Sequence, residues 1–209
     1  SGRIVLQDLL KINNSIETDN FHKKKEFEDI ISYSKQCSSN IHLIGLLSDG
    51  GVHSHINHLK EIILSLSEVK EKIFIHAFTD GRDVDPKSGI NYIEELEEFC
   101  KKNGGELSTV VGRYYSMDRD NRWDRIQKAY DLICNGKGEK IESFSNEIKK
   151  SYSNNKTDEF IEPLVKTNKN GDPKECRPHH RFLHSLFRRV QQEGCLFHIG
   201  NRPMNADHE

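Results

Sequence analysis

The chain has 209 residues, of which 34% are hydrophobic and 31% are charged, and its formal net charge is −2. This length suits one domain with flanking segments, and the balanced charge argues against a nucleic-acid binder. We find neither an apolar run of roughly 18 residues for a membrane helix nor an N-terminal signal segment. Five scattered cysteines without a C-x-x-C pair favour a reducing compartment, so we expect a cytoplasmic protein.

The N-terminal part is predicted to be helical. The chain begins at Ser1 without an initiator methionine, so we expect a fragment. Apolar positions indicate one helix from about Gln7 and a second one from about Phe27 to Cys37. The polar residues that follow Cys37 end the second helix.

The middle of the chain repeats a strand, a polar loop and a helix three times. Strands are expected over 41–47, 72–78 and 106–111, and helices over 59–66, 92–100 and 123–134. Such a succession predicts an α/β domain with a parallel sheet and helices on both faces, a three-layer arrangement. We expect Cys100, Cys134 and Trp123 in the core, and His76 as a buried structural histidine in its strand.

The C-terminal part is less regular. We expect a helix over Ile141–Tyr152 and an extended segment over Asp158–Val165. The tail from Cys176 has little strand signal, although four apolar residues could face one side of a short helix, namely Phe182, Leu183, Leu186 and Phe187.

Charged residues gather in the three loops that follow the predicted strands. In an open α/β sheet, ligands bind beyond the carboxyl ends of the strands. Arginine forks bind phosphate and carboxylate, while aspartate and histidine can accept hydroxyl protons. The sequence therefore predicts a site for a small hydroxylated anion. The loops supply Asp49, His53, His55, Asp80, Arg82, Asp83, Asp85, Arg113, Asp118, Arg119 and Arg122.

Two other readings of these loops stay open. His53, His55 and His58 could bind zinc in a hydrolase, although tightly spaced Cys or acidic partners are missing. The arginines of the third loop alternate with aspartates, so they could form surface ion pairs; the residues concerned are Arg113, Asp118, Arg119, Asp120, Arg122, Asp124 and Arg125.

The same loops resemble a known family. The segments Gly45–His55, Asp80–Asp83 and Gly112–Arg125 closely resemble cofactor-independent phosphoglycerate mutases, and Gly2–Val5 is similar to the stretch that enters the same domain. The resemblance extends in order from residue 1 to about residue 165. The family's later Asn-aromatic-Arg motif is not matched by the tail.

The resemblance implies an isomerase of glycolysis that interconverts 3-phosphoglycerate and 2-phosphoglycerate. It implies a linker over 1–20, a substrate-binding transferase domain over 21–173 and a divergent tail over 174–209. The serine that carries the phosphoryl group, and two manganese ions, belong to a phosphatase-like domain that we expect to be missing from this chain. We therefore expect no metal ligands here, and no activity of this chain alone.

Motif positions imply the site residues. His53, Arg82, Asp83, Arg113 and Arg119 would bind substrate, and Asp83 would be the catalytic base. The implied partners are 2- and 3-phosphoglycerate and the phosphatase-like domain, without nucleic acid or membrane, and we expect a monomer. A non-catalytic anion-binding domain derived from this fold is the alternative. Because rim residues support no core, replacing Arg82 or Arg113 by alanine is expected to weaken binding with little loss of fold.

Overall fold

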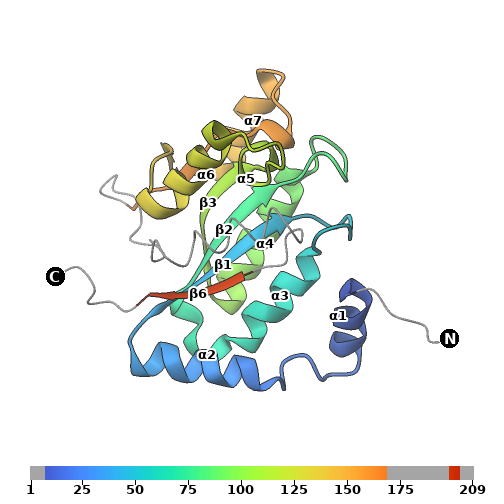
Figure 1. Cartoon of the computed structure of the whole chain (residues 1–209), viewed down its shortest axis with the longest axis vertical. Coiled ribbons are helices and arrows are strands. Elements are labelled where there is room, and N and C mark those ends of the chain that lie inside the picture. The colour runs from blue at the N-terminus through green and yellow to red at the C-terminus, as the bar shows by residue number, and fades with distance from the viewer. Residues whose placement is uncertain (1–7, 169–197, 203–209) are drawn as a thin grey trace, which may run out of the picture.

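A mixed sheet forms the centre of the molecule (Figure 1). The computed structural model describes residues 8–168 and the backbone of 198–202. Within them the six-stranded sheet has the order β4-β5-β3-β2-β1-β6. The strands are β1 (Asn40–Leu47), β2 (Ile73–Thr79), β3 (Glu106–Gly112), β4 (Glu139–Ile141), β5 (Leu164–Lys166) and β6 (His198–Arg202).

The three predicted strands form the parallel centre of this sheet. β2 lies between β1 and β3 and runs parallel to both. Antiparallel pairs flank this centre, β6 with β1 and β5 with β3, while β4 pairs parallel with β5. The predicted parallel α/β sheet is therefore confirmed, and short strands of opposite direction extend it on both sides.

Helices cover both faces of the sheet (Figure 1). They are α1 (Asp8–Glu17), α2 (Lys25–Gln36), α3 (Ile56–Ser65), α4 (Gly89–Asn103), α5 (Arg113–Ser116), α6 (Trp123–Asn135) and α7 (Phe144–Ser153), with 3-10 turns η1 (Ser67–Lys72) and η2 (Asp158–Phe160).

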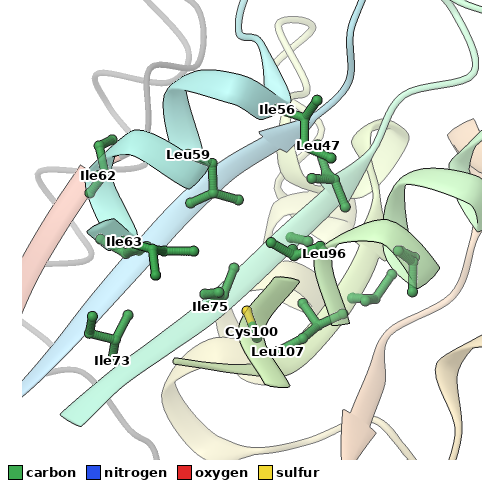
Figure 2. Packing of buried hydrophobic residues seen from close by; sticks show 14 of the residues in the cluster. Leu47, Ile56, Leu59, Ile62, Ile63, Ile73, Ile75, Leu96, Cys100 and Leu107 are labelled. Atoms are coloured by element: carbon green, nitrogen blue, oxygen red, sulfur yellow. The ribbon is translucent and has the colours of Figure 1, made fainter. Parts of the chain in front are cut away.

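The larger core lies between the sheet and helices α3, α4 and α7. Leu47 of β1 and Ile75 of β2 are fully buried there against Leu59 of α3 and Leu96 of α4 (Figure 2). β1 is buried along almost its whole length because helices cover both faces of the sheet. Strands that are buried on both faces are nearly continuous apolar runs in the sequence.

The second core lies on the opposite face, under α5 and α6. Ile44 of β1 and Phe78 of β2 alternate with the residues of the larger core and pack in a cluster with Ala129 and Ile133 of α6. Two apolar clusters on opposite faces of one sheet make three layers, as the sequence predicts.

Several local expectations are confirmed and others need correction. Cys100, Cys134 and His76 are buried as expected. Trp123 is not in the core as expected: it is the first residue of α6, its exposed fraction is 65%, and the buried residues of this helix begin only at Ile126.

The chain between residues 139 and 166 departs most from the predicted elements. Ile141 belongs to strand β4, and the helix begins only at Phe144, where the Ser143 side chain caps it by accepting a hydrogen bond from the Asn146 amide. The segment expected to be extended over 158–165 contains the η2 turn before β5.

At the two ends, α1 occupies much of the expected 1–20 linker and packs Ile12 and Ile16 against the larger core. The tail contributes strand β6, against our expectation. The possible helix around residues 182–187 lies outside the described residues.

Candidate functional site

The three charged loops leave the sheet at one level. In the strand register Leu47 pairs with Thr79, and Thr79 pairs with Gly112, so β1, β2 and β3 end side by side. Because all three strands run in the same direction, the loops after them meet at the same edge of the sheet (Figure 1).

The first loop is folded back tightly on the end of β1. The Ser54 hydroxyl donates to the Leu46 carbonyl at 2.5 Å, and the Ile56 amide donates to the Ser48 carbonyl at 2.8 Å. A Cβ on Gly50 would lie 3.0 Å from a side-chain carbon of Val84 in the second loop. Glycine therefore allows the first and second loops to pack together.

The second loop is organised by Asp80, the first residue after β2. Its Oδ1 accepts hydrogen bonds from the amides of Arg82 (3.2 Å) and Asp83 (3.1 Å). Burial opposes ionisation of Asp80, but the hydrogen bonds from Asp83, Ser48, Arg113 and Arg82 outweigh it and lower its pKa. Asp80 is therefore a buried, charged carboxylate.

Arg113, the first residue after β3, joins the second and third loops. Its Nη1 donates to Oδ1 of Asp80 and to Oδ2 of Asp83, each at 2.6 Å. Only 7% of Arg113 is exposed. Burial disfavours its charge, but the bonds to Asp83 and Asp80 outweigh burial and raise its pKa. The guanidinium is thus held rigidly between two carboxylates.

His53 of the first loop completes the cluster. Its Nε2 lies 3.7 Å from Oδ2 of Asp83. Burial and the positive charge of Arg113 lower its pKa, and the opposing effect of Asp83 is smaller. His53 is therefore mainly neutral near pH 7 and can donate one hydrogen bond and accept another.

Arg119 lies on the exposed part of the third loop. Asp118 shapes this loop by accepting hydrogen bonds from the amides of Asp120 (3.0 Å) and Arg122 (2.8 Å). The Arg119 charge is one of those that lower the pKa of His53, so it acts on the same cluster. Within residues 8–168 Arg119 makes no ion pair.

The other two arginines of this loop fit the ion-pair reading. Arg122 pairs with Asp124 at 3.3 Å on the surface. Arg125 pairs with Asp118 at 3.0 Å, and its guanidinium lies 3.9 Å from the ring centroid of Tyr114. Both have structural partners outside the Arg113 cluster.

Arg82 does not join this cluster. Its Nε lies 3.2 Å from Oε1 of Glu159 in η2, and its side chain is 66% exposed. The structure thus brings together His53, Asp83 and Arg113, with Arg119 beside them, whereas Arg82 faces a partner that sequence reasoning missed. No spacing rule points to Glu159, which lies far along the chain.

Asp80 is the other residue whose importance sequence reasoning missed. The sequence counts it among the charged loop residues without a role of its own, yet its carboxylate holds both the second loop and Arg113. Its place directly after a strand is the signal that could have found it. Chemically, the cluster offers a fixed guanidinium, two carboxylates and a neutral imidazole, with the exposed Arg119 beside it and Arg82 on the same loop as Asp83.

The three histidines of the zinc hypothesis have separate partners. The Nδ1 of His55 accepts from the Asn57 amide and caps α3, while Nε2 of His58 lies 2.5 Å from the Asn13 side-chain oxygen. In the described part of the chain, no three His, Cys, Asp or Glu side chains are arranged to hold a metal ion.

Among the helices that the structure describes, none has the length and apolar character to span a bilayer.

Comparisons of sequence agree with this picture. The family model "BPG-independent PGAM N-terminus" matches residues 12–192. A 2,3-bisphosphoglycerate-independent phosphoglycerate mutase of Flavobacterium psychrophilum is 49% identical over 174 residues, covering 83% of this chain and 34% of that protein. The enzyme of the same name from Bacteroides fragilis is 46% identical over 176 residues, covering 84% and 35%. The chain thus spans about a third of the length of these relatives.

The fold has a solved counterpart. The structure of Leishmania mexicana phosphoglycerate mutase at low cobalt concentration matches with a TM-score of 0.76 and 27% identity, covering 85% of this chain and 34% of that one. Together with the family match over most of the sequence, this shows that the chain belongs to the family of the BPG-independent phosphoglycerate mutase N-terminus.

Proposed function

We propose that this chain is the substrate-binding transferase domain of a phosphoglycerate mutase that interconverts 3-phosphoglycerate and 2-phosphoglycerate. The observation that carries the proposal is the cluster of Arg113, Asp83 and His53 at the shared edge of three parallel strands. Its groups match a small acid that carries a carboxylate, a hydroxyl and a phosphate.

Each side chain has a role in this proposal. Arg113, already fixed by two carboxylates, binds an anionic group of the substrate, and the exposed Arg82 and Arg119 bind the other one. Asp83 takes the proton from the glycerate hydroxyl that receives the phosphoryl group, and returns a proton when the phosphoryl group leaves. Neutral His53 hydrogen-bonds the substrate next to Asp83.

The phosphoryl group itself is handled elsewhere. We propose that it passes through a phosphoserine in a phosphatase-like domain of the complete enzyme. Two manganese ions would be held there, since the described residues of this chain do not fit a metal site. Within this chain we propose that the transferase domain spans residues 21–173, and that the protein is a cytoplasmic monomer.

Calorimetric titration with 3-phosphoglycerate tests the binding part of this proposal. Arg82→Ala and Arg113→Lys are expected to weaken binding by about tenfold or more, because a charge-assisted hydrogen bond contributes roughly 1.5–3 kcal/mol. Arg122→Ala is the matched control, since it removes an arginine of the same motif that pairs with Asp124 outside the cluster. Equal affinities in all four proteins would contradict the assignment.

Turnover separates a catalytic from a purely anion-binding role. In a protein that joins this chain to the phosphoserine-bearing domain, Asp83→Asn is expected to lower kcat by about 10²- to 10⁴-fold, the range for losing an acid–base group, with binding retained. Unchanged kcat would contradict the role of Asp83 as the base, and absence of turnover by the joined protein would support the non-catalytic alternative. Turnover by the chain alone would contradict the two-domain proposal.

A further inference from the structure

Asp158 ties together both ends of the loop that carries Asp83. The Thr79 hydroxyl, at the end of β2, donates to the Asp158 carbonyl at 2.7 Å. The Asp158 amide donates to the Pro86 carbonyl at 2.9 Å. The amide of Gly89, the first residue of α4, donates to Oδ2 of Asp158 at 2.8 Å. One residue from η2 thus holds the loop where it begins and where it ends.

The carboxylate of Asp158 is fully buried and has a second donor. The Tyr152 hydroxyl of α7 donates to Oδ1 by a short hydrogen bond. Burial raises the pKa of Asp158 to about 6, against the lowering effect of the bonds from Tyr152 and Gly89. A buried carboxyl is costly to keep in a fold, and the residues of the proposed reaction do not contact this one.

The fit around Asp158 is tight. A Cβ on Gly89 would lie 2.7 Å from Oδ1 of Asp158, and a Cβ on Gly81 would lie 2.9 Å from the Asp158 Cβ. Side chains at either position would push Asp158 away. The loop backbone at Gly81 and Gly89 therefore lies in direct contact with Asp158 of η2, and neither position has room for a side chain.

The neighbouring residue, Glu159, contacts the same loop through its side chain. Glu159 pairs with Arg82 at 3.2 Å, so η2 contacts both the loop backbone and one of its predicted substrate arginines. The loop's own bonds shape two separate turns: the amides of Arg82 and Asp83 donate to Asp80, and the Lys87 amide and the Ser88 hydroxyl donate to Asp85.

We propose that the Asp158 side chain is a positioning group for the reaction: its carboxylate, bonded to the Gly89 amide, fixes the end of the loop from Asp80 to Ser88 on η2 and so holds the Asp83 carboxylate on Arg113. This inference deepens the proposed function and rests on it for the meaning of the site. The clamping itself is a property of the protein without substrate.

Hydrogen exchange and calorimetry test the inference on the 209-residue chain, at a temperature where circular dichroism shows every variant folded. Asp158→Ala is expected to speed amide exchange across residues 80–88 and to weaken 3-phosphoglycerate binding, each by about tenfold, which is the factor for roughly 1.4 kcal/mol. The control Asp131→Ala removes a carboxylate of α6 that bonds Asn135 and Lys137, and should change neither.

A conservative variant separates positioning from bulk stability. Asp158→Asn is expected to restore exchange and affinity to near the wild-type values, because its carbonyl can accept from Gly89 while its amide group donates to the Tyr152 oxygen. Gly89→Ala should reproduce the loss, since its methyl group displaces the carboxylate. Should Asp158→Ala fail to fold, the contrast between these two variants decides.

The possible results are distinguishable. Wild-type exchange and affinity in folded Asp158→Ala, or in Gly89→Ala, would overturn the positioning role and leave the proposed function intact. Absence of 3-phosphoglycerate binding by the wild-type chain would instead count against the proposed function, while the exchange measurement still tests whether Asp158 clamps the loop.

Discussion

At the scale of single residues, the geometry of the site depends on one buried guanidinium and on the two carboxylates that pair with it. Arg113 neutralises part of the charge of Asp80 and Asp83, both of which lie on one short loop. Without the guanidinium, two carboxylates would face each other with little water around Asp80. Arg113 therefore has a structural role in addition to its proposed role in binding, and it is far more buried than Arg82.

Burial of Arg113 changes the result expected for its removal. Arg113→Ala should lower the free energy of unfolding by about 3–5 kcal/mol, the range for breaking a buried ion pair from one side. Urea unfolding checks this, with the surface variant Arg122→Ala as a control whose midpoint should stay that of the wild type. A wild-type midpoint for Arg113→Ala would show that Asp80 and Asp83 tolerate each other without the guanidinium between them.

The sequence predicted which arginines lie in the loops after the strands, but it did not predict which residues they pair with. Arg82, Arg113 and Arg119 all follow predicted strands, yet one pairs with Glu159, one is clamped by two aspartates and one is exposed. Pairing depends on side chains brought together by the fold, and no local spacing encodes it.

At the scale of elements, the segment from η2 to β5 acts as a brace behind the loops. Besides the contacts of Asp158, the Gly112 amide at the end of β3 donates to the Ile161 carbonyl at 2.8 Å. A Cβ on Gly112 would lie 2.2 Å from the Glu159 carbonyl oxygen, which is a backbone atom. The end of β3, directly before Arg113, therefore packs so closely against this brace that only a glycine fits at position 112.

Gly112→Ala tests this close approach. Overpacking typically costs about 1–3 kcal/mol, and the upper end is expected because the obstacle is backbone and cannot rotate away. The midpoint of urea unfolding should fall, whereas Ser108→Ala, a small buried change in the same strand, should have a much weaker effect. Equal shifts for both variants would mean that the brace yields easily.

Elements were predictable where their signal is local. Periodicity located the three parallel strands and the helices after them to within a few residues. It failed for β4 and β6, which are short and depend on pairing with strands distant in the sequence, and for the three-residue 3-10 turn η2. A strand of three residues such as β4 carries too little alternation to be recognised.

At the scale of the whole molecule, buried histidines make stability depend on pH. In the middle of the sheet Nε2 of His76 lies 3.0 Å from Nδ1 of His42, and its Nδ1 lies 2.8 Å from the Thr109 hydroxyl. Burial, with His42 as a further cause, lowers the pKa of His76 well below its ordinary value. The folded protein therefore resists protonation at this position.

This predicts a loss of stability in mild acid. The unfolded chain takes up a proton at His76 as pH falls below about 6.5, while the folded chain does not, so stability falls towards the lower, folded pKa by up to about 1.4 kcal/mol per pH unit. Urea unfolding at about pH 7.5 and about pH 5.5, on either side of the unfolded pKa, should show a larger loss for the wild type than for His76→Gln. Parallel losses in the two proteins would contradict the prediction.

The sequence by itself determined the three-layer α/β fold, the parallel centre of the sheet and the edge where the charged loops meet. Those features follow from hydrophobic periodicity and from the common direction of parallel strands, which are encoded within each strand–helix unit. Only the tertiary structure decided that Arg113 is buried, that Arg82 faces Glu159 and that Asp158 clamps the loop. These contacts join residues that lie about 30 to 80 positions apart, and chain folding alone brings them within hydrogen-bonding distance.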